Sequence, residues 1–572
     1  MKTTPGSNPQ CDTASKPETK SEVTPESNLN ANTEEPVLLR MPSEILTAIC
    51  RHLLNKDIKA FRLACPTICH AIPPRFTRVF LSPNPRNLEV FRAVAAHPTF
   101  RLGVREIVVD DARLADPTQL WDRQNDGSSD ETPIHGGSDT EDATNTAWFN
   151  RRCARNLKEL RNRNVNDTEN LVARAARAEE REAQSPLEKC QQHYDALLCQ
   201  QFEVMAAGED ARALVEGLDA FPALERITVT PSTHGYLYTS LYRTPMIRNF
   251  PRGFNYPIPR GWPTYKGATM MHPLNRWTTR MGWTADDVSR EKAHWRALVL
   301  VLETLAARVL NGGKAVVPEL VFDVHALNTG ISPYMLTDDC DEYENLALLL
   351  RQPGFRRLDL PILVTGTPPD EVSLLENGRL KSLLAGARHL QHFRLRFDGH
   401  AYEEVPFSRR FFPLQKLLPL KSWDQLRHFG LSNAVVRIAD LVDALVALPA
   451  TLRSVELSFL KFERRSDEDV RGETHAMLLE RIKARVAEAA WAANQPRVTL
   501  GMAKVRANVT GRGLWLSKEI GDYLYGFGRN PFGTHEDILL PGMGWLADEY
   551  DPEFERPYKA YKDYRALWYG EG

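Results

Sequence analysis

The chain has 572 residues, of which 42% are hydrophobic, so it is long enough to bury more than one sizeable core. Its 72 lysine and arginine residues nearly balance its 74 aspartate and glutamate residues. This balance excludes a general electrostatic attraction to nucleic acid or to an anionic membrane surface, and we expect neither as a partner.

The N-terminal residues 1–35 are rich in Ser, Thr, Asn, Pro and Glu and have no apolar periodicity. They cannot bury enough apolar surface to offset the entropy lost on ordering, so we expect a disordered tail. The segment also lacks the apolar stretch of a signal peptide. The eight cysteines are spaced too unevenly for a disulfide framework. The sequence therefore predicts a soluble protein of a reducing compartment, either the cytoplasm or the nucleus.

Residues 36–82 form a compact apolar block that predicts three short helices. Pro42 suits the first position of a helix, and Ile45 and Ile49 recur on one side of that helix. Asp57 suits the cap of a second helix, and a short third helix ends before two prolines. So small a unit has too little interior to bury every apolar side chain, and some of them must face a partner.

The same block resembles an F-box. The family pattern is Leu-Pro-x-Glu-Ile, a helix, a Leu-Leu pair, an Asp and an Arg-Leu-x-Cys segment. Here Met41 replaces the usual Leu, and Phe76 and Phe80 stand where many members have Trp. The residues that match the pattern are Pro42, Glu44, Ile45, Leu53, Leu54, Asp57, Arg62, Leu63 and Cys65. The alternative is a generic helical segment.

The resemblance implies a partner. In this family the F-box binds the Skp-type linker subunit, which joins substrate receptors to the cullin scaffold of an SCF ubiquitin ligase. By resemblance, the residues that would form or support this interface are Pro42, Ile45, Leu46, Ile49, Leu53, Leu54 and Ile58.

Two charged stretches follow. Residues 83–145 contain a first repeat-like unit and then an acidic segment, which we expect to be an exposed disordered loop. Residues 146–216 alternate acidic and basic side chains within a helical pattern, as solvated helix faces usually do. They predict an inserted helical hairpin that covers the edge of the next domain. The alternative is a dedicated binding arm.

A pattern of apolar-x-x-apolar-x-apolar recurs along the chain, mainly in residues 217–525. Its fourth and sixth residues fall on one face of a short strand, and its first residue comes from the preceding turn. The copies occupy residues 104–109, 224–229, 317–322, 355–360, 390–395, 426–431 and 452–457. Helical patterns separate several copies, at residues 295–310, 343–351, 379–387 and 438–448.

These patterns predict an α/β fold in which an irregular leucine-rich-repeat-like solenoid follows the three-helix F-box. The combination is similar to the F-box proteins of filamentous fungi, which often carry degenerate leucine-rich repeats after the box. Because the spacing is irregular, an ordinary α/β domain is the alternative. Residues 526–572 are rich in aromatic and turn-forming residues, and we expect them to cap the open end of the solenoid.

Residues 236–283 mix aromatic side chains and arginines with Pro and Gly, which predicts a long loop on a surface. Tyr, Trp and Arg dominate the binding energy of protein interfaces. The loop therefore predicts a site for a protein client, built from Arg252, Tyr256, Arg260 and Trp262. The alternative is that the aromatic side chains anchor the loop to the solenoid.

The sequence contains no motif for a catalytic nucleophile or a phosphate loop, and we expect no cofactor. Cys65 and Cys69, with Cys50 upstream, could be drawn as a zinc site, but free cysteines on packed helices more often serve as small apolar residues. We therefore predict a non-catalytic adaptor that joins a ubiquitin ligase to a protein client. Two alternatives stay open: an interaction scaffold that acts without ubiquitylation, and an enzyme site in the aromatic loop.

Overall fold

The computed structural model describes residues 40–50, 52–53, 55–116, 141–264, 277–279, 282–312, 317–337, 339–364, 374–398, 412–463, 472–503, 509–533 and 538–558. The chain divides into two compact units, Met1–Arg75 and Phe76–Gly572. The predicted tail of residues 1–35 and the acidic segment up to residue 140 lie outside the described residues.

The first unit contains three short helices, α1 (Ser43–Cys50), α2 (Asn55–Ala64) and α3 (Pro66–Ala71). The sequence predicts these helices, but not their first residues. The carbonyl of Pro42 accepts hydrogen bonds from the amides of Ile45 and Leu46, so Pro42 precedes α1 instead of opening it. Helix α2 begins before Asp57, which therefore lies in its first turn, where the helix dipole favours a carboxylate.

A small apolar core holds the three helices together. It consists of Leu46, Cys50, Ile58, Ile68 and Ile72. The Arg62 side chain of α2 adds hydrogen bonds to two carbonyls at the end of α3, those of Cys69, at 2.5 Å, and Ile72. Leu46 and Cys50 thus bury one side of α1 in this core, while Glu44, Ile45 and residues 47–49 of the helix are exposed.

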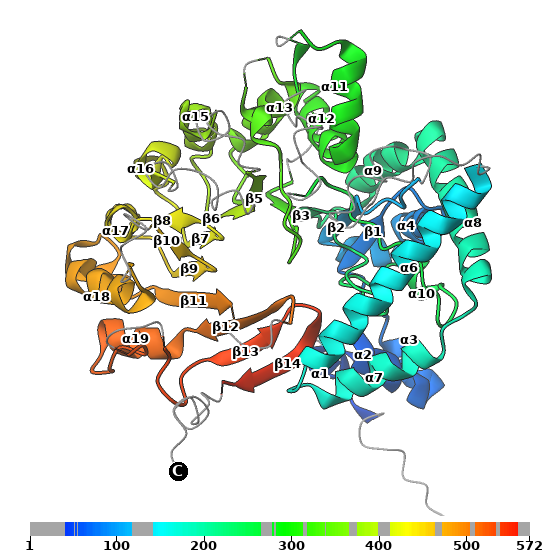
Figure 1. Cartoon of the computed structure of the whole chain (residues 1–572), viewed down its shortest axis with the longest axis horizontal. Helices are drawn as coiled ribbons and strands as arrows, with labels where there is room; N and C mark the ends of the chain where they lie inside the picture. Colours follow the sequence, from blue (N-terminus) through cyan, green and yellow to red (C-terminus); the bar gives the residue numbers. More distant parts are fainter. Residues whose placement is uncertain are drawn as a thin grey trace, which may run out of the picture. The chain divides into compact units, whose positions relative to one another are not determined.

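The second unit contains a large, mostly parallel sheet (Figure 1). In the described part of the chain, its neighbouring strands follow almost in chain order, and those from β1 to β11 are parallel, whereas β12, β13 and β14 pair antiparallel. The strands are β1 (Arg78–Leu81), β2 (Glu106–Asp110), β3 (Arg226–Thr230), β4 (Glu319–Phe322), β5 (Arg357–Leu363), β6 (His392–Asp398), β7 (His428–Ser432), β9 (Ser454–Ser458), β11 (Arg497–Ala503), β12 (Arg512–Leu516), β13 (Trp545–Asp548) and β14 (Asp551–Pro557). Strands β8 (Val435–Val436) and β10 (Lys461–Phe462) form a separate small pair.

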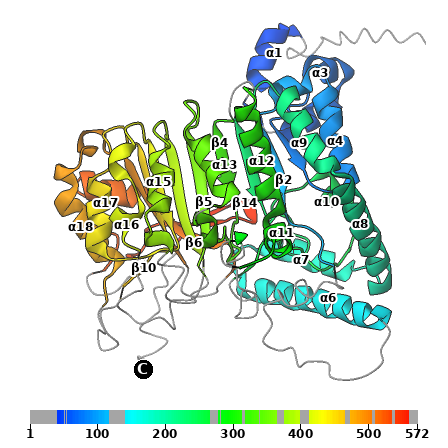
Figure 2. The ribbon, with the colours of Figure 1, turned by 90° about the horizontal axis from the view of Figure 1, so that it is seen from above.

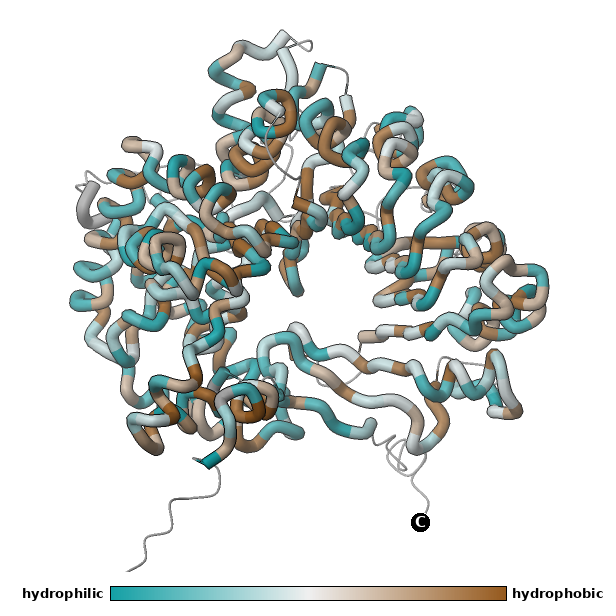
Figure 3. The backbone as a smooth tube through the Cα atoms, turned by 180° about the vertical axis from the view of Figure 1, so that it is seen from behind, coloured by the Kyte–Doolittle hydropathy of each residue, from teal (hydrophilic) through white to brown (hydrophobic). Residues whose placement is uncertain are grey.

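All seven copies of the repeated apolar pattern are strands of this sheet, as predicted. Their fourth residues pair in register as a row of Ile107, Ile227, Leu320, Leu358, Phe393, Phe429 and Val455. Every side chain of this row is buried. Figure 3 shows hydrophobic and hydrophilic residues interspersed along the strands. A slip of one residue would move the row to the opposite face of the sheet, so the pattern fixes the register.

Helices of the second unit lie along one side of the sheet, on the outside in Figure 1. The helices predicted between the repeats are confirmed, as α12 (Arg296–Leu310), α13 (Asp341–Leu350), α15 (Arg379–Ala385) and α17 (Ile438–Val446). The same side carries α4 (Pro85–Ala96), α9 (Glu209–Ala220), α11 (Ala285–Lys292), α16 (Leu414–Leu417), α18 (His475–Arg485) and α19 (Lys518–Tyr525). From α12 to α19 most of these helices contact the next helix along the chain.

Three buried tryptophans fix this helical layer at separate points along the chain. The indole N–H of Trp295 donates to the carbonyl of Gly330 at 3.0 Å, and those of Trp423 and Trp491 donate to helix-end carbonyls at 3.2 and 2.8 Å. Each ring therefore fills apolar space while its one polar group is satisfied.

The predicted hairpin of residues 146–216 is wrong, because this stretch contains four helices. They are α6 (Glu141–Asn166), α7 (Leu171–Glu182), α8 (Leu187–Ala207) and α9, with the short α10 (Pro245–Arg248) nearby (Figure 2). A second apolar core fastens α6 and α8 to the loop that follows β3, through residues that include Phe149, Tyr194, Phe254 and Tyr256. The expectation of a wholly solvated charged face is also wrong, since Arg163 and Arg177 are buried.

Within the described residues, no helix has both the length and the apolar composition needed to cross a bilayer.

Candidate functional site

Helix α1 divides its apolar residues between the interior and the surface. Leu46 is only 5% exposed and packs in the core with Cys50. Ile45 and Ile49, which lie on a different side of the same helix, are 51% and 41% exposed. Large aliphatic side chains at the surface of so small a unit are a candidate contact for another protein.

The residues that the resemblance implies for linker binding therefore fall into two groups. Pro42, Ile45 and Ile49 are exposed and could touch a partner directly. Leu53 is half-buried and Ile58 is buried, so Ile58 supports the helices instead. Leu54 lies outside the described residues.

One exposed apolar residue of the first unit was not singled out as a site residue from the sequence. Leu63 on α2 is 87% exposed, the largest value among the large apolar side chains described in this unit. Its neighbour Arg62 bonds to the end of α3, which orients α2 and leaves Leu63 at the surface. Its place in the Arg-Leu-x-Cys segment was the available signal.

The cysteines that could be drawn as a zinc site lie in the packed first unit. Cys50 is buried in its core, and the Cys65 sulfur accepts a hydrogen bond from the amide of Ile68 at 3.4 Å. Cys65 therefore caps α3. No group of three His, Cys, Asp or Glu side chains in the described ranges is arranged to hold a metal ion.

The structure corrects the predicted client site in the aromatic loop. Trp262 is completely buried, and its indole N–H donates to the carboxylate of Asp111 at 2.8 Å. Tyr256 is also buried, stacks on Phe254 and is hydrogen-bonded to His234 at 2.8 Å. These two aromatic residues anchor the loop, which is the alternative that the sequence left open.

The two arginines of the predicted client site are exposed and paired. Arg252 lies 2.8 Å from Glu179 of α7, and Arg260 lies 3.8 Å from Glu159 of α6. Such exposed pairs contribute at most about 1 kcal/mol each. The structure therefore does not gather the four predicted residues into one surface.

A different polar surface lies on the sheet, opposite the helices. We call the third residues of the seven repeats, together with Asp359, Arg394 and Glu456, the polar face. The third residues pair in register as Glu106, Arg226, Glu319, Arg357, His392, His428 and Ser454. These residues were not predicted as a surface, because the repeat was recognised by its apolar positions alone. The same pattern could have predicted them, because residues that alternate with buried ones along a strand point to the opposite face of the sheet.

Charge pairs cross the polar face from strand to strand. Arg226 of β3 lies 2.6 Å from Glu319 of β4. Arg394 of β6 pairs with Glu456 of β9, two strands away. Cross-strand pairs of opposite charge stabilise a sheet modestly, and they also leave a surface with fixed hydrogen-bonding groups.

Two stacked histidines lie in the middle of the polar face. The rings of His392 and His428 are 4.1 Å apart and nearly parallel. His428 shares a hydrogen bond of 2.7 Å with Ser454, and burial, together with nearby positive charge, lowers its pKa to about 3. His428 is therefore neutral at physiological pH and offers the face a hydrogen-bonding group without a charge.

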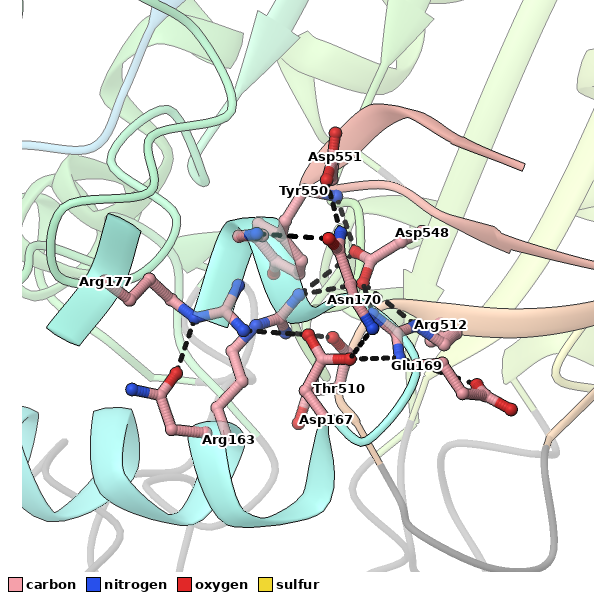
Figure 4. Close-up of polar contacts among 12 residues, drawn as sticks. Arg163, Asp167, Glu169, Asn170, Arg177, Thr510, Arg512, Asp548, Tyr550 and Asp551 are labelled. Atoms are coloured by element: carbon pink, nitrogen blue, oxygen red, sulfur yellow. Dashed lines mark hydrogen bonds and ion pairs between the residues drawn. The ribbon is translucent and has the colours of Figure 1, made fainter. Parts of the chain in front are cut away.

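Charged residues from distant parts of the second unit form a buried network, shown in Figure 4. Asp548 of β13 lies 2.9 Å from Arg163 of α6 and 3.0 Å from Arg512 of β12. Asp167, just after α6, lies 2.8 Å from Arg512 and 2.8 Å from Arg177 of α7. All five side chains are buried.

This network joins helices α6 and α7 to the antiparallel end of the sheet. Burial alone would raise the pKa of Asp167, but hydrogen bonds from Arg512 and Arg177 outweigh it and hold that pKa at about 2. Arg163 also lies over the rings of Tyr236 and Tyr550, at 5.4 and 5.2 Å from their centres. The network is thus a structural joint between helices α6 and α7 and strands β12 and β13.

A further buried carboxyl group lies at the end of β2. Asp110 is 2% exposed and lines a small cavity together with Gln201 and Met246. Burial raises its pKa to about 7. Because this pKa exceeds the unfolded value, the stability that Asp110 contributes is fully present below about pH 4 and is lost as the pH rises through about 7.

Asp110→Asn should abolish this pH dependence. At pH 8 we expect the variant to have a free energy of unfolding about 2–4 kcal/mol above that of the wild type, with little difference at pH 4. Urea titrations followed by circular dichroism at both pH values measure the difference. An equal difference at the two pH values would contradict the assignment of the titration to Asp110.

The comparisons with known proteins give no relative for this chain: no family model matches the sequence, and no curated protein matches it significantly. The candidate surfaces are therefore assigned from their own residues.

Proposed function

We propose that the chain is the substrate-recognition adaptor of an SCF-type ubiquitin ligase. In this proposal the first unit is an F-box that binds the Skp-type linker subunit, and the second unit is a leucine-rich-repeat-like solenoid that binds a protein client. The observation that carries the proposal is the exposure of Ile45 and Ile49 beside the buried Leu46. It falls on the residues that the F-box resemblance implies.

The separation of buried and exposed apolar side chains on α1 supports linker binding. Burial of Leu46 and Cys50 fixes the helix on the unit's own core, so Ile45 and Ile49 are presented on a rigid element. Covering these two side chains and the exposed Leu63 removes apolar surface from water, at about 25 cal/mol per Å². A groove-shaped apolar partner surface would fit such an exposed helix side.

The repeating register supports the solenoid. The copies are consecutive parallel strands, and the helices between them pack mainly against their neighbours in sequence. This is the arrangement expected when each repeat is stabilised by the repeats beside it. Strands β12–β14 then extend the sheet beyond the last repeat, and the buried charge network holds them to α6 and α7.

The polar face is the surface that we assign to the client. It presents charged and hydrogen-bonding side chains on strands, which hold them in place better than a loop would. The adaptor's contribution to ubiquitin transfer would be proximity, because holding the client beside the charged enzyme raises its effective concentration. We assign no catalytic residue and no cofactor to the chain.

A binding measurement with the purified linker subunit tests the proposal. Titration calorimetry of the full chain with the linker should give a one-to-one complex with a negative change in heat capacity, because apolar surface is buried. Absence of binding at micromolar concentrations would remove the proposed role.

A cellular measurement separates the adaptor from a scaffold that does not ubiquitylate. Proteins that co-purify with the chain should become longer-lived when its gene is deleted. If the linker binds but no such protein changes its lifetime, the scaffold is the better description.

A further inference from the structure

The strands of the polar face begin at an edge where charged residues meet in order. Along this edge the carbonyl of one residue accepts a hydrogen bond from an amide at the start of the next strand, so backbone hydrogen bonds fix the order of the residues. In chain order the edge contains Arg105, Glu225, Pro318, Arg356, Gln391, Arg427, Arg453 and Arg497.

The first half of this edge is neutralised. Arg105 lies 3.1 Å from Glu225, and Arg356 lies 3.6 Å from Glu225 and 3.0 Å from Glu319. Each of these arginines therefore has a carboxylate partner within the chain.

The second half carries positive charge without such partners. We call Arg427, Arg453 and Arg497 the arginine edge. The amide of Arg453 donates to the carbonyl of Arg427 at 2.7 Å, and the amide of Arg497 donates to that of Arg453 at 2.9 Å. All three residues are exposed, and in the described part of the chain none is within ion-pair distance of an acidic side chain. The guanidinium group of Arg497 donates a hydrogen bond to the hydroxyl of Ser517 at 2.8 Å.

Arg427 and Arg453 lie opposite each other on adjacent strands and repel each other, and Arg497, which pairs with Ser454, adds a third positive charge one residue further along. Neighbouring strands are about 4.8 Å apart, and like charges placed opposite each other destabilise a sheet. An anionic partner bound along the edge would offset this electrostatic repulsion. On the basis of the proposed function, we propose that the arginine edge binds an acidic segment of the protein client.

The polar face favours an acidic peptide over a nucleic acid as this partner. Glu456 lies three residues after Arg453, in β9, where it pairs with Arg394, so a phosphate backbone that continued from the edge along the strands would meet a carboxylate. The whole chain carries a formal charge of −2 and so does not attract polyanions in general. A peptide can place its carboxylates at the edge alone.

Fluorescence polarisation with a labelled peptide rich in Asp and Glu tests this inference, with a peptide carrying Asn and Gln at the same places as the probe control. Arg427→Glu/Arg453→Glu should weaken binding of the acidic peptide at least about tenfold. Arg105→Glu, on the neutralised half of the same edge, should change it less than about twofold. The neutral peptide should not bind the wild type.

A stability measurement adds a second, independent signature. Arg453→Glu places a carboxylate opposite Arg427 and one strand away from Arg497, so its melting temperature should exceed that of the wild type while its peptide affinity falls. A loss of affinity through general unfolding would lower the melting temperature instead. Arg453→Gln should show both effects more weakly.

The inference is overturned if the wild type does not bind the acidic peptide, if Arg427→Glu/Arg453→Glu binds it equally well, or if single-stranded RNA binds more tightly than the peptide. Titrating the same preparations with the linker subunit separates the two proposals. Linker binding without peptide binding defeats only the arginine edge, and the reverse defeats only the ligase role.

Discussion

Asp548→Ala is expected to lower the free energy of unfolding by about 3–5 kcal/mol. Asp548 is the shared partner of Arg163 and Arg512, and its removal leaves two buried guanidinium groups short of a counter-charge. Of the carboxylates that remain, Asp167 already serves Arg512 and Arg177, and Glu169 lies 3.8 Å from Arg512. Chemical denaturation followed by circular dichroism measures the loss, with the transition of the second unit as the readout.

Glu555→Ala is the matched control, because Glu555 lies on the adjacent strand β14 and is exposed. A surface change of this kind should stay within about 0.5 kcal/mol of the wild type. If Asp548→Ala costs no more than Glu555→Ala, the network does not hold α6 and α7 to the sheet.

Ile45→Asp/Ile49→Asp is expected to reduce the affinity for the linker subunit at least about 100-fold. Each substitution puts a carboxylate where an apolar contact is proposed, and burying an unpaired charge costs several kcal/mol. Because both side chains are largely exposed in the free chain, its fold should survive the change. Calorimetry gives the affinity, and circular dichroism confirms the fold.

Two further variants of α1 serve as controls for this result. Thr47→Asp adds a charge at an exposed position away from Ile45 and Ile49, and should leave the affinity within about threefold of the wild type. Leu46→Asp puts a charge in the core and should unfold the first unit. Equal losses in Thr47→Asp and Ile45→Asp/Ile49→Asp would show that charge near the linker matters and that the apolar contact does not.

The strands of the repeats could be predicted because each copy carries its own evidence. In the copy that ends at Val109, for example, Ile107 and Val109 are buried side by side on one face, and the pattern that predicts them is local in sequence. The antiparallel strands β12–β14 were not predicted, since they do not repeat the pattern and their pairing depends on partners in the finished sheet.

Long-range partners explain the two main errors. The alternation of charge around Arg163 resembles a solvated helix, but its carboxylate partner, Asp548, lies 385 residues away. Trp262 is of a type common in interfaces, but in the folded chain its indole N–H donates to Asp111, which lies 151 residues earlier in the sequence. The local sequence shows the charged residues and the aromatic ring. Whether each is buried against a partner or exposed to water depends on the folded chain.

Hydrogen exchange of the full chain, with and without the linker subunit, tests the central claim most directly. We predict that linker binding slows exchange of the backbone amides of α1 and α2, around Ile45, Ile49 and Leu63, and leaves the strands of the polar face unchanged. Slower exchange confined to the second unit, or no change anywhere at saturating linker, would contradict the assignment of the first unit as the ligase-binding module.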